Sequence, residues 1–143
     1  MTVHVEVENR SAHGVDETAV RAAVVATLQA ESVTAGEVGI VLVRPDEMAA
    51  LNAAHRGKDE PTDVLSFPVD GRDALPEGLP RQLGDVVVCP ERAEADGTPV
   101  ALLLVHGVLH LVGYDHEADN GDMLRRQEAI FQEVGPVVAV RPS

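Results

Sequence analysis

Aromatic residues are scarce in this chain of 143 residues, which has two phenylalanines, one tyrosine and no tryptophan. Proteins that hold single-stranded nucleic acid by stacking its bases need several exposed rings. The scarcity therefore argues against a binding platform of that kind. The chain also has only one cysteine, Cys89, which excludes an internal disulfide and suits a protein of the cytosol.

Long apolar runs and basic residues are lacking as well. No run of about 18 apolar residues is present, so we expect no membrane span. The first residues, MTVHVEVENR, do not have the pattern of a signal peptide. The 11 basic residues against 24 acidic ones give a formal net charge of −13. Because phosphate affinity comes from clustered lysine and arginine, we expect any RNA contact to use a local basic pocket and a bound metal. The lack of a membrane span and of a signal peptide leads us to expect a cytoplasmic protein.

The apolar content of 45% is enough for one core, so we expect a single domain over residues 1–143. Alternation and β-branched residues predict four strands, and apolar residues at helical spacing predict four helices. The strands are expected at 3–8, 38–43, 62–69 and 84–89, and the helices at about 16–31, 45–54, 98–111 and 122–134. These elements do not alternate strictly. The fold class is therefore α+β, with a small mixed four-stranded sheet packed with about four to five helices.

The helix expected to end near Leu111 differs from the others. Thr98 and Pro99 have the pattern of an N-cap and a first helical position, and Gly113 is a natural C-cap. From Val100 to Val105 the helix is apolar on every side, which predicts a buried central helix.

A long connection separates two of the predicted strands. The segment from Asp70 to Gln82 is rich in glycine, proline and charge. Loops of this length in compact domains are usually functional, so we expect a mobile flap beside the functional cleft.

Three histidines follow the apolar part of the central helix, in the segment HGVLHLVGYDH. His106 and His110 are four residues apart and should stack on one face of the helix. Gly113 lets the chain turn back, so that His116 can reach the same point. Three neutral imidazoles suit Zn²⁺ or another transition metal, with a fourth position open to water. The alternative is that these are structural or surface histidines.

The second half of this segment has the spacing of the metzincin proteases, whose first half reads H-E-x-x-H with the glutamate as general base. Gly107 stands at the position of that glutamate, which makes a metallopeptidase the least favoured hypothesis. A closed, structural site would need a fourth protein ligand, and Cys89 and Asp115 are the candidates. Cys89 is more typical of a core residue, and Asp115 is as well suited to orienting an imidazole as to binding metal. An open fourth position is therefore favoured.

A second group of polar residues lies in LNAAHRGKDEPTDVLSFP, which starts at Leu51. Arg56 and Lys58 form a basic spot in an acidic chain, where a helix is expected to end. The guanidinium of Arg56 is suited to gripping phosphate oxygens, and the alternative is a solvated helix end. His55 is expected to face solvent.

Together, LN..HRGKDEPTDVLSFP, LGDVVVCP from Leu83 and HGVLHLVGYDHE resemble the YbeY family of bacterial rRNA maturation factors, which are described as single-strand-specific endoribonucleases. The resemblance covers most of the chain. It implies one zinc ion on His106, His110 and His116, and a role near that site for Arg56. It also implies 16S rRNA 3′-end maturation and ribosome quality control, with the small ribosomal subunit or ribosome-associated proteins as partners. His55 departs from the family, which more often has an aromatic residue such as tyrosine there.

We therefore expect a metal-dependent endoribonuclease acting on single-stranded RNA, with Arg56 stabilising charge on the phosphate. The sequence leaves open whether water or the RNA 2′-OH is the nucleophile. A non-catalytic, metal-stabilised ribosome assembly factor is the second hypothesis.

Overall fold

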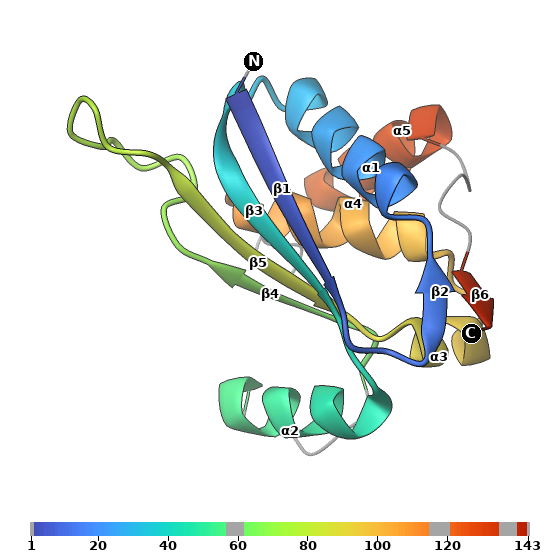
Figure 1. Ribbon diagram of the computed structural model, residues 1–143. Helices are drawn as coiled ribbons and strands as arrows, with labels where there is room; N and C mark the ends of the chain where they lie inside the picture. Colours follow the sequence, from blue (N-terminus) through green and yellow to red (C-terminus); the bar gives the residue numbers. More distant parts are fainter. Residues whose placement is uncertain (1, 57–61, 115–120, 135–139, 143) are drawn as a thin grey trace.

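The computed structural model describes residues 2–56, 62–114, 121–134 and 140–142. Its centre is a four-stranded sheet in the order β1-β3-β5-β4 (Figure 1). Strands β1 (Thr2–Asn9), β3 (Ala35–Leu42) and β5 (Gln82–Val88) run parallel. Strand β4 (Val64–Pro68) pairs antiparallel to β5 at one edge. The predicted α+β class with a small mixed four-stranded sheet is confirmed, and each predicted strand is present.

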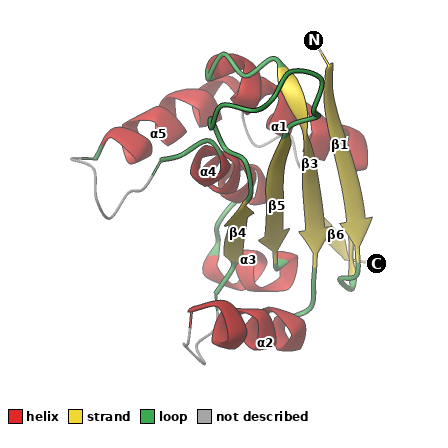
Figure 2. Cartoon of the chain, turned by 90° about the vertical axis from the view of Figure 1, so that its left-hand side faces the viewer, coloured by secondary structure: helices red, strands yellow, loops and turns green. Residues whose placement is uncertain are grey.

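The helices cover one face of this sheet and its lower end. Helices α1 (Glu17–Ala30), α4 (Val100–Leu111) and α5 (Asp122–Val134) cover one face, and α2 (Pro45–Arg56) packs beneath the lower end of the sheet as drawn (Figures 1 and 2). The short helix α3 (Pro90–Asp96) follows β5. Five helices in the described part of the chain agree with the expected four to five, although α3 was not among the predicted ranges.

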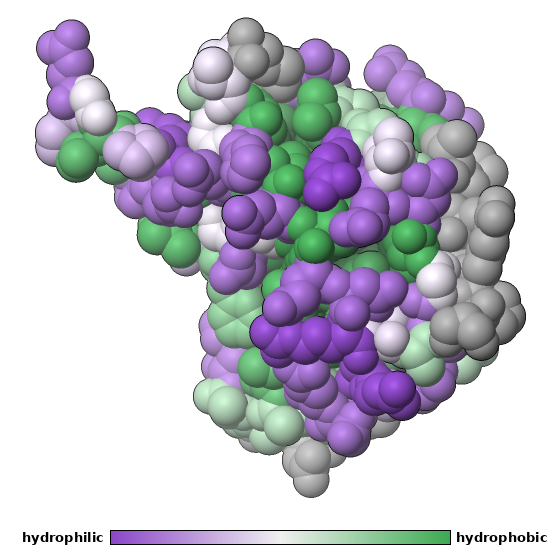
Figure 3. Space-filling model, in the orientation of Figure 1, coloured by the Kyte–Doolittle hydropathy of each residue, from purple (hydrophilic) through white to green (hydrophobic). Residues whose placement is uncertain are grey.

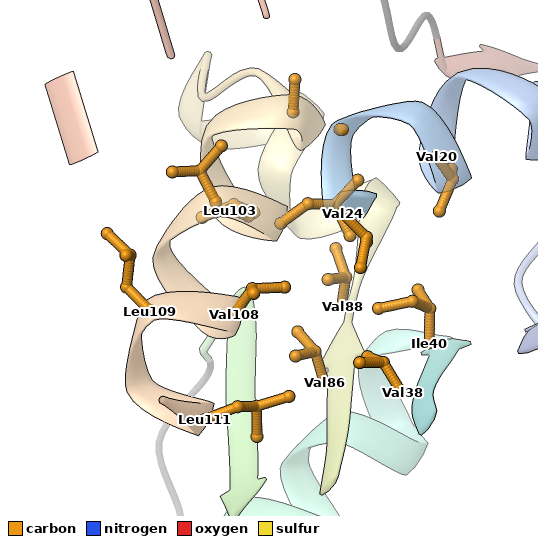
Figure 4. Close-up of a cluster of buried hydrophobic side chains, with 14 of the residues drawn as sticks. Val20, Val24, Val38, Ile40, Val86, Val88, Leu103, Val108, Leu109 and Leu111 are labelled. Atoms are coloured by element: carbon orange, nitrogen blue, oxygen red, sulfur yellow. The ribbon is translucent and has the colours of Figure 1, made fainter. Parts of the chain in front are cut away.

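The core between α1, α4 and the sheet is made of aliphatic side chains (Figure 4). Val86 and Val88 of β5 point into it beside Ile40 of β3 and meet Val24 and Val108 from the two helices. Each such side chain, fully buried, contributes about 1.5–3 kcal/mol relative to an exposed one. This layer holds α4 against the middle of the sheet, which confirms the predicted buried central helix.

Helix α4 begins one residue later than predicted. Its N-cap is Pro99, in an extended conformation and with no side-chain cap, so the assignment of Thr98 as N-cap and Pro99 as the first helical residue is wrong. The reason lies in the preceding helix, because the Thr98 N–H bonds to the carbonyl of Ala93 and so closes the end of α3. At the other end Val112 is the C-cap, and Gly113 follows it with φ 106°, the left-handed conformation expected of a helix-ending glycine.

The long connection between β4 and β5 contains no helix or strand from Asp70 to Arg81, and Gln82 begins β5. It projects beyond the sheet and is largely hydrophilic (Figures 1 and 3). Hydrogen bonds hold its root, the two ends near Asp70 and Gln82. The Gln82 N–H donates to the Asp70 carboxylate at 2.7 Å, and Arg72 Nε donates to the Val112 carbonyl at 3.1 Å. The flap is therefore irregular, as predicted, and its root contacts the C-terminal end of α4. Its mobility remains a prediction.

A second, two-stranded sheet was not predicted. Strand β2 (His13–Val15) pairs antiparallel with β6 (Val140–Pro142), which joins two segments far apart in the sequence. Within the described ranges, no helix has the length and apolar character needed to span a membrane.

Candidate metal centre

His106 and His110 lie one turn apart near the C-terminal end of α4, and both side chains are half-buried. Their ring centroids are 4.8 Å apart, with the rings nearly perpendicular. This is the side-by-side placement expected from their spacing. His116 and Asp115 lie outside the described residues, so the third ligand stays a prediction. Among the residues that are described, no group of three or more histidine, cysteine or acidic side chains is placed to hold a metal.

Hydrogen bonds define which nitrogen of each imidazole carries the proton. His110 Nδ1 lies 2.9 Å from the carbonyl oxygen of Tyr114, and since a carbonyl only accepts, Nδ1 must be the donor. His106 Nδ1 lies 2.7 Å from Oε1 of Gln127 on α5, which is likewise an acceptor. In the neutral form both rings then carry their lone pair on Nε2. Metal-binding histidines typically have such a partner on the other nitrogen, so this pair fits a zinc site.

The close packing around Gly107 explains why no carboxylate follows His106. Ser66 Oγ on β4 donates to the Gly107 carbonyl at 3.0 Å, so the helix lies directly against the sheet here. A Cβ at position 107 would overlap Cγ1 of Val86 and would lie 3.1 Å from its Cγ2. The position that holds the general base in metzincins therefore faces the sheet in this protein. A glutamate would not fit there without moving α4.

Cys89 follows β5 and is fully buried, in a cluster with Met48 of α2 and Leu65 of β4. This cluster lies on the other face of the sheet from the core under α4. Burial raises the pKa of the Cys89 thiol above its usual value, which favours the neutral form over the thiolate that metals need. The interpretation of Cys89 as a core residue is confirmed.

Arg56 is the last residue of α2. That end of α2 lies on the same side of the molecule as the histidine end of α4 (Figure 1). The preceding residue, His55, is exposed, as predicted, and its ring also packs on Phe67 of β4 with centroids 4.5 Å apart. The direction of the Arg56 guanidinium and the position of Lys58 lie outside the described part, so the phosphate contact remains a prediction.

Two polar residues that are connected to the histidines, one directly and one through other residues, were missed in the sequence. Glu31 is a buried carboxylate at the end of α1, and Gln127 is the Nδ1 partner of His106. Each had a signal in the sequence. Glu31 follows Val24 and Leu28 in phase with the buried face of α1, and Gln127 follows the buried Met123 by four residues on α5. Polar residues in the apolar phase of a helix are those that need a buried partner.

Comparison with known proteins agrees with the resemblance seen in the motifs. The family model described as Endoribonuclease YbeY matches residues 4–135. A protein of that name from Roseiflexus sp. (strain RS-1) is 41% identical over 149 residues, which cover 94% of this chain and 93% of the relative. Another, from Chloroflexus aggregans, is 43% identical and covers 94% of this chain and 98% of its own. The solution structure of a Thermotoga maritima protein, 28% identical, matches 91% of this chain and 88% of its own with a TM-score of 0.57. The chain belongs to the YbeY endoribonuclease family.

Proposed function

We propose that this protein is a metal-dependent endoribonuclease that cleaves single-stranded RNA, acting in 16S rRNA 3′-end maturation and ribosome quality control. Membership of a family named for endoribonuclease activity, over residues 4–135, supports the RNA-cleaving reaction. The observation that carries the metal dependence is the histidine pair of α4, in which both Nδ1 atoms bond to acceptors.

The metal, zinc or another transition metal, would be held by His106, His110 and His116. Bound there, Zn²⁺ would polarise a phosphoryl oxygen and lower the pKa of a coordinated water towards about 7. The chain's own part is to present two imidazoles in the required tautomer from a rigid, buried helix. Helix α4 itself, VALLLVHGVLHL, has no acidic residue, so a carboxylate base of the metzincin kind is not part of the proposal.

Arg56 would bind the phosphate and stabilise the negative charge that develops on it during cleavage. Its placement at the end of α2, on the histidine side of the molecule, supports this role (Figure 2). The charge balance bears on how RNA arrives. At a net charge of −13 the surface as a whole repels phosphate, so we propose that the small ribosomal subunit or a ribosome-associated protein in the cytoplasm presents the RNA.

The test is cleavage of a fluorescently labelled single-stranded RNA by zinc-loaded protein, with a duplex of the same sequence as the competing substrate. We expect the single strand to be cut, and we expect a chelator or His110→Ala to abolish the cutting. His4→Ala is the matched control, because His4 is an exposed histidine on β1 and should cut like the wild type.

Cleavage that survives both the chelator and His110→Ala would contradict the proposal. A wild type that holds zinc and binds ribosomal subunits, yet cuts no RNA, would instead support the non-catalytic assembly factor. Chelator-sensitive cleavage of unstructured peptides would support a peptidase.

A further inference from the structure

The C-terminal end of α1 carries a buried negative charge. Glu31 is the C-cap residue of this helix, and its side chain is only 4% exposed. A carboxylate is disfavoured there twice, because the helix dipole is negative at this end and because burial removes the water that solvates the charge. Its presence therefore requires strong local partners.

Those partners come from three other parts of the chain. Arg126 of α5 donates through Nε to the Glu31 carboxylate and through Nη2 to the Ala30 carbonyl at 2.5 Å. Arg72, at the root of the flap, donates to the Glu31 carboxylate at 3.4 Å and to its carbonyl at 3.2 Å. The Tyr114 phenol lies beside the same carboxylate, and hydrogen bonding to Glu31 is the main cause that raises the pKa of Tyr114.

Two of these partners are directly connected to the histidine pair. Tyr114 accepts the His110 Nδ1 proton through its backbone carbonyl, while its phenol lies beside Glu31. Arg126 is the neighbour in sequence of Gln127, which accepts the Nδ1 proton of His106. Glu31 thus contacts both segments that support the imidazoles. The segment at the end of α4 supports His110, and the segment on α5 supports His106.

We propose that Glu31 is a positioning residue for the metal centre: by holding Arg126 and Tyr114 it keeps the Gln127 side chain and the Tyr114 carbonyl in place as acceptors for His106 and His110. This inference rests on the proposed function, since it assigns to Glu31 a task at the same site. The task is to keep both neutral rings in the Nδ1–H tautomer, with the lone pair on Nε2. Residues behind metal ligands usually change metal affinity by about 10–100-fold when they are lost.

The decisive variant is Glu31→Gln, which keeps the shape of the side chain and removes its charge. The imidazole tautomers are read from the ¹⁵N signals of the zinc-free protein above about pH 8, where the rings are neutral. We expect His106 and His110 to be Nδ1–H in the wild type and mixed in Glu31→Gln, with zinc affinity lowered by about 10–100-fold. Glu128→Gln, the same change on the exposed face of α5, is the matched control and should behave like the wild type.

A second variant keeps the proposal testable if Glu31→Gln does not fold. Tyr114→Phe removes only the phenol, so it should loosen His110 and leave His106 unchanged. Wild-type tautomers and wild-type zinc affinity in a folded Glu31→Gln or, where that variant does not fold, in Tyr114→Phe would overturn the inference. A wild type that binds no zinc would instead contradict the metal dependence of the proposed function, and the tautomers of the zinc-free proteins would still decide the role of Glu31.

Discussion

Gly107 is the residue at which helix propensity and core packing make opposite demands. It follows His106 directly, yet its Cα faces Val86 and the Ser66 hydroxyl on the sheet. Replacing it with alanine would gain up to about 1 kcal/mol of helix propensity. Forcing a methyl group into a filled core costs about 1–3 kcal/mol, and this larger effect should decide the outcome.

We therefore expect Gly107→Ala to lower the free energy of unfolding by up to about 2 kcal/mol, measured by denaturant titration. The cause is tested in a Val86→Ala background, where space has been made for the new methyl group. There the same substitution should cost much less. Equal costs in both backgrounds would show that the contact with Val86 is not the reason.

Cys89 should be inert in the folded protein. Burial raises the pKa of its thiol, so the folded protein favours the neutral form. The contribution of this neutral thiol to the stability of the fold is fully present below the ordinary thiol pKa of about 8.5. That contribution is lost as the pH rises through the raised value. We expect a thiol reagent at about pH 8 to label the native protein far more slowly than the unfolded protein. Equal labelling rates would contradict the buried position.

Single residues also show where sequence reasoning fails. The histidines were found because their spacing has a direct chemical meaning, whereas Glu31 and Gln127 were passed over. Their role depends on α1, α4 and α5 meeting around one point, and a residue's partners in other elements cannot be read from its own segment. A polar residue in an apolar helical phase shows that a partner is needed, without identifying it.

Helix α2 ends at Arg56, directly after the exposed residues Ala53, Ala54 and His55. We expect Arg56→Glu to leave thermal stability nearly unchanged, within about 0.5 kcal/mol, as is usual for surface positions. RNA cleavage should fall sharply, because a negative charge would then face the phosphate. Unfolding of the variant, or cleavage at the wild-type rate, would show that the assigned role is wrong. Arg44→Glu, an exposed arginine just before α2, is the control.

The flap shows how far a loop can be predicted from composition. Its irregular conformation follows from glycine and proline content, but its attachment to α4 through Arg72 does not. We expect backbone amides from Asp73 to Leu79 to exchange with solvent much faster than those of Val86 and Val88 in β5. Gln82, whose N–H bonds to Asp70 at the root, should be intermediate. Protection across the loop equal to that of β5 would rule out a mobile flap.

Element boundaries were predictable where one residue type decides them. Asp16 caps α1 by accepting from the N–H groups of Thr18 and Ala19, and Gly113 ends α4. The start of α4 was misplaced because Thr98 completes α3, a helix of seven residues that has too few turns to show a clear apolar period. The pairing of β2 with β6 was missed for a similar reason, since three-residue strands have almost no alternation to detect.

At the scale of the whole molecule, the α+β class and the mixed sheet were predictable because the strands and the central helix have strong, unbroken patterns. The strand order was not, since it depends on which segments pair across the chain. The net charge of the whole molecule also explains why RNA binding is expected to depend on a local site. A surface with a net charge of −13 does not attract RNA, so we propose that binding and cleavage take place locally, at the metal and at Arg56.

We propose above that this chain holds a metal with His106 and His110 of α4 and with His116. Its most direct test is elemental analysis of the purified protein, compared with His106→Ala, His110→Ala and His116→Ala after equilibration with zinc. We expect about one metal ion per chain in the wild type and loss of the metal in each variant. Full metal retention in all three single-histidine variants would contradict it.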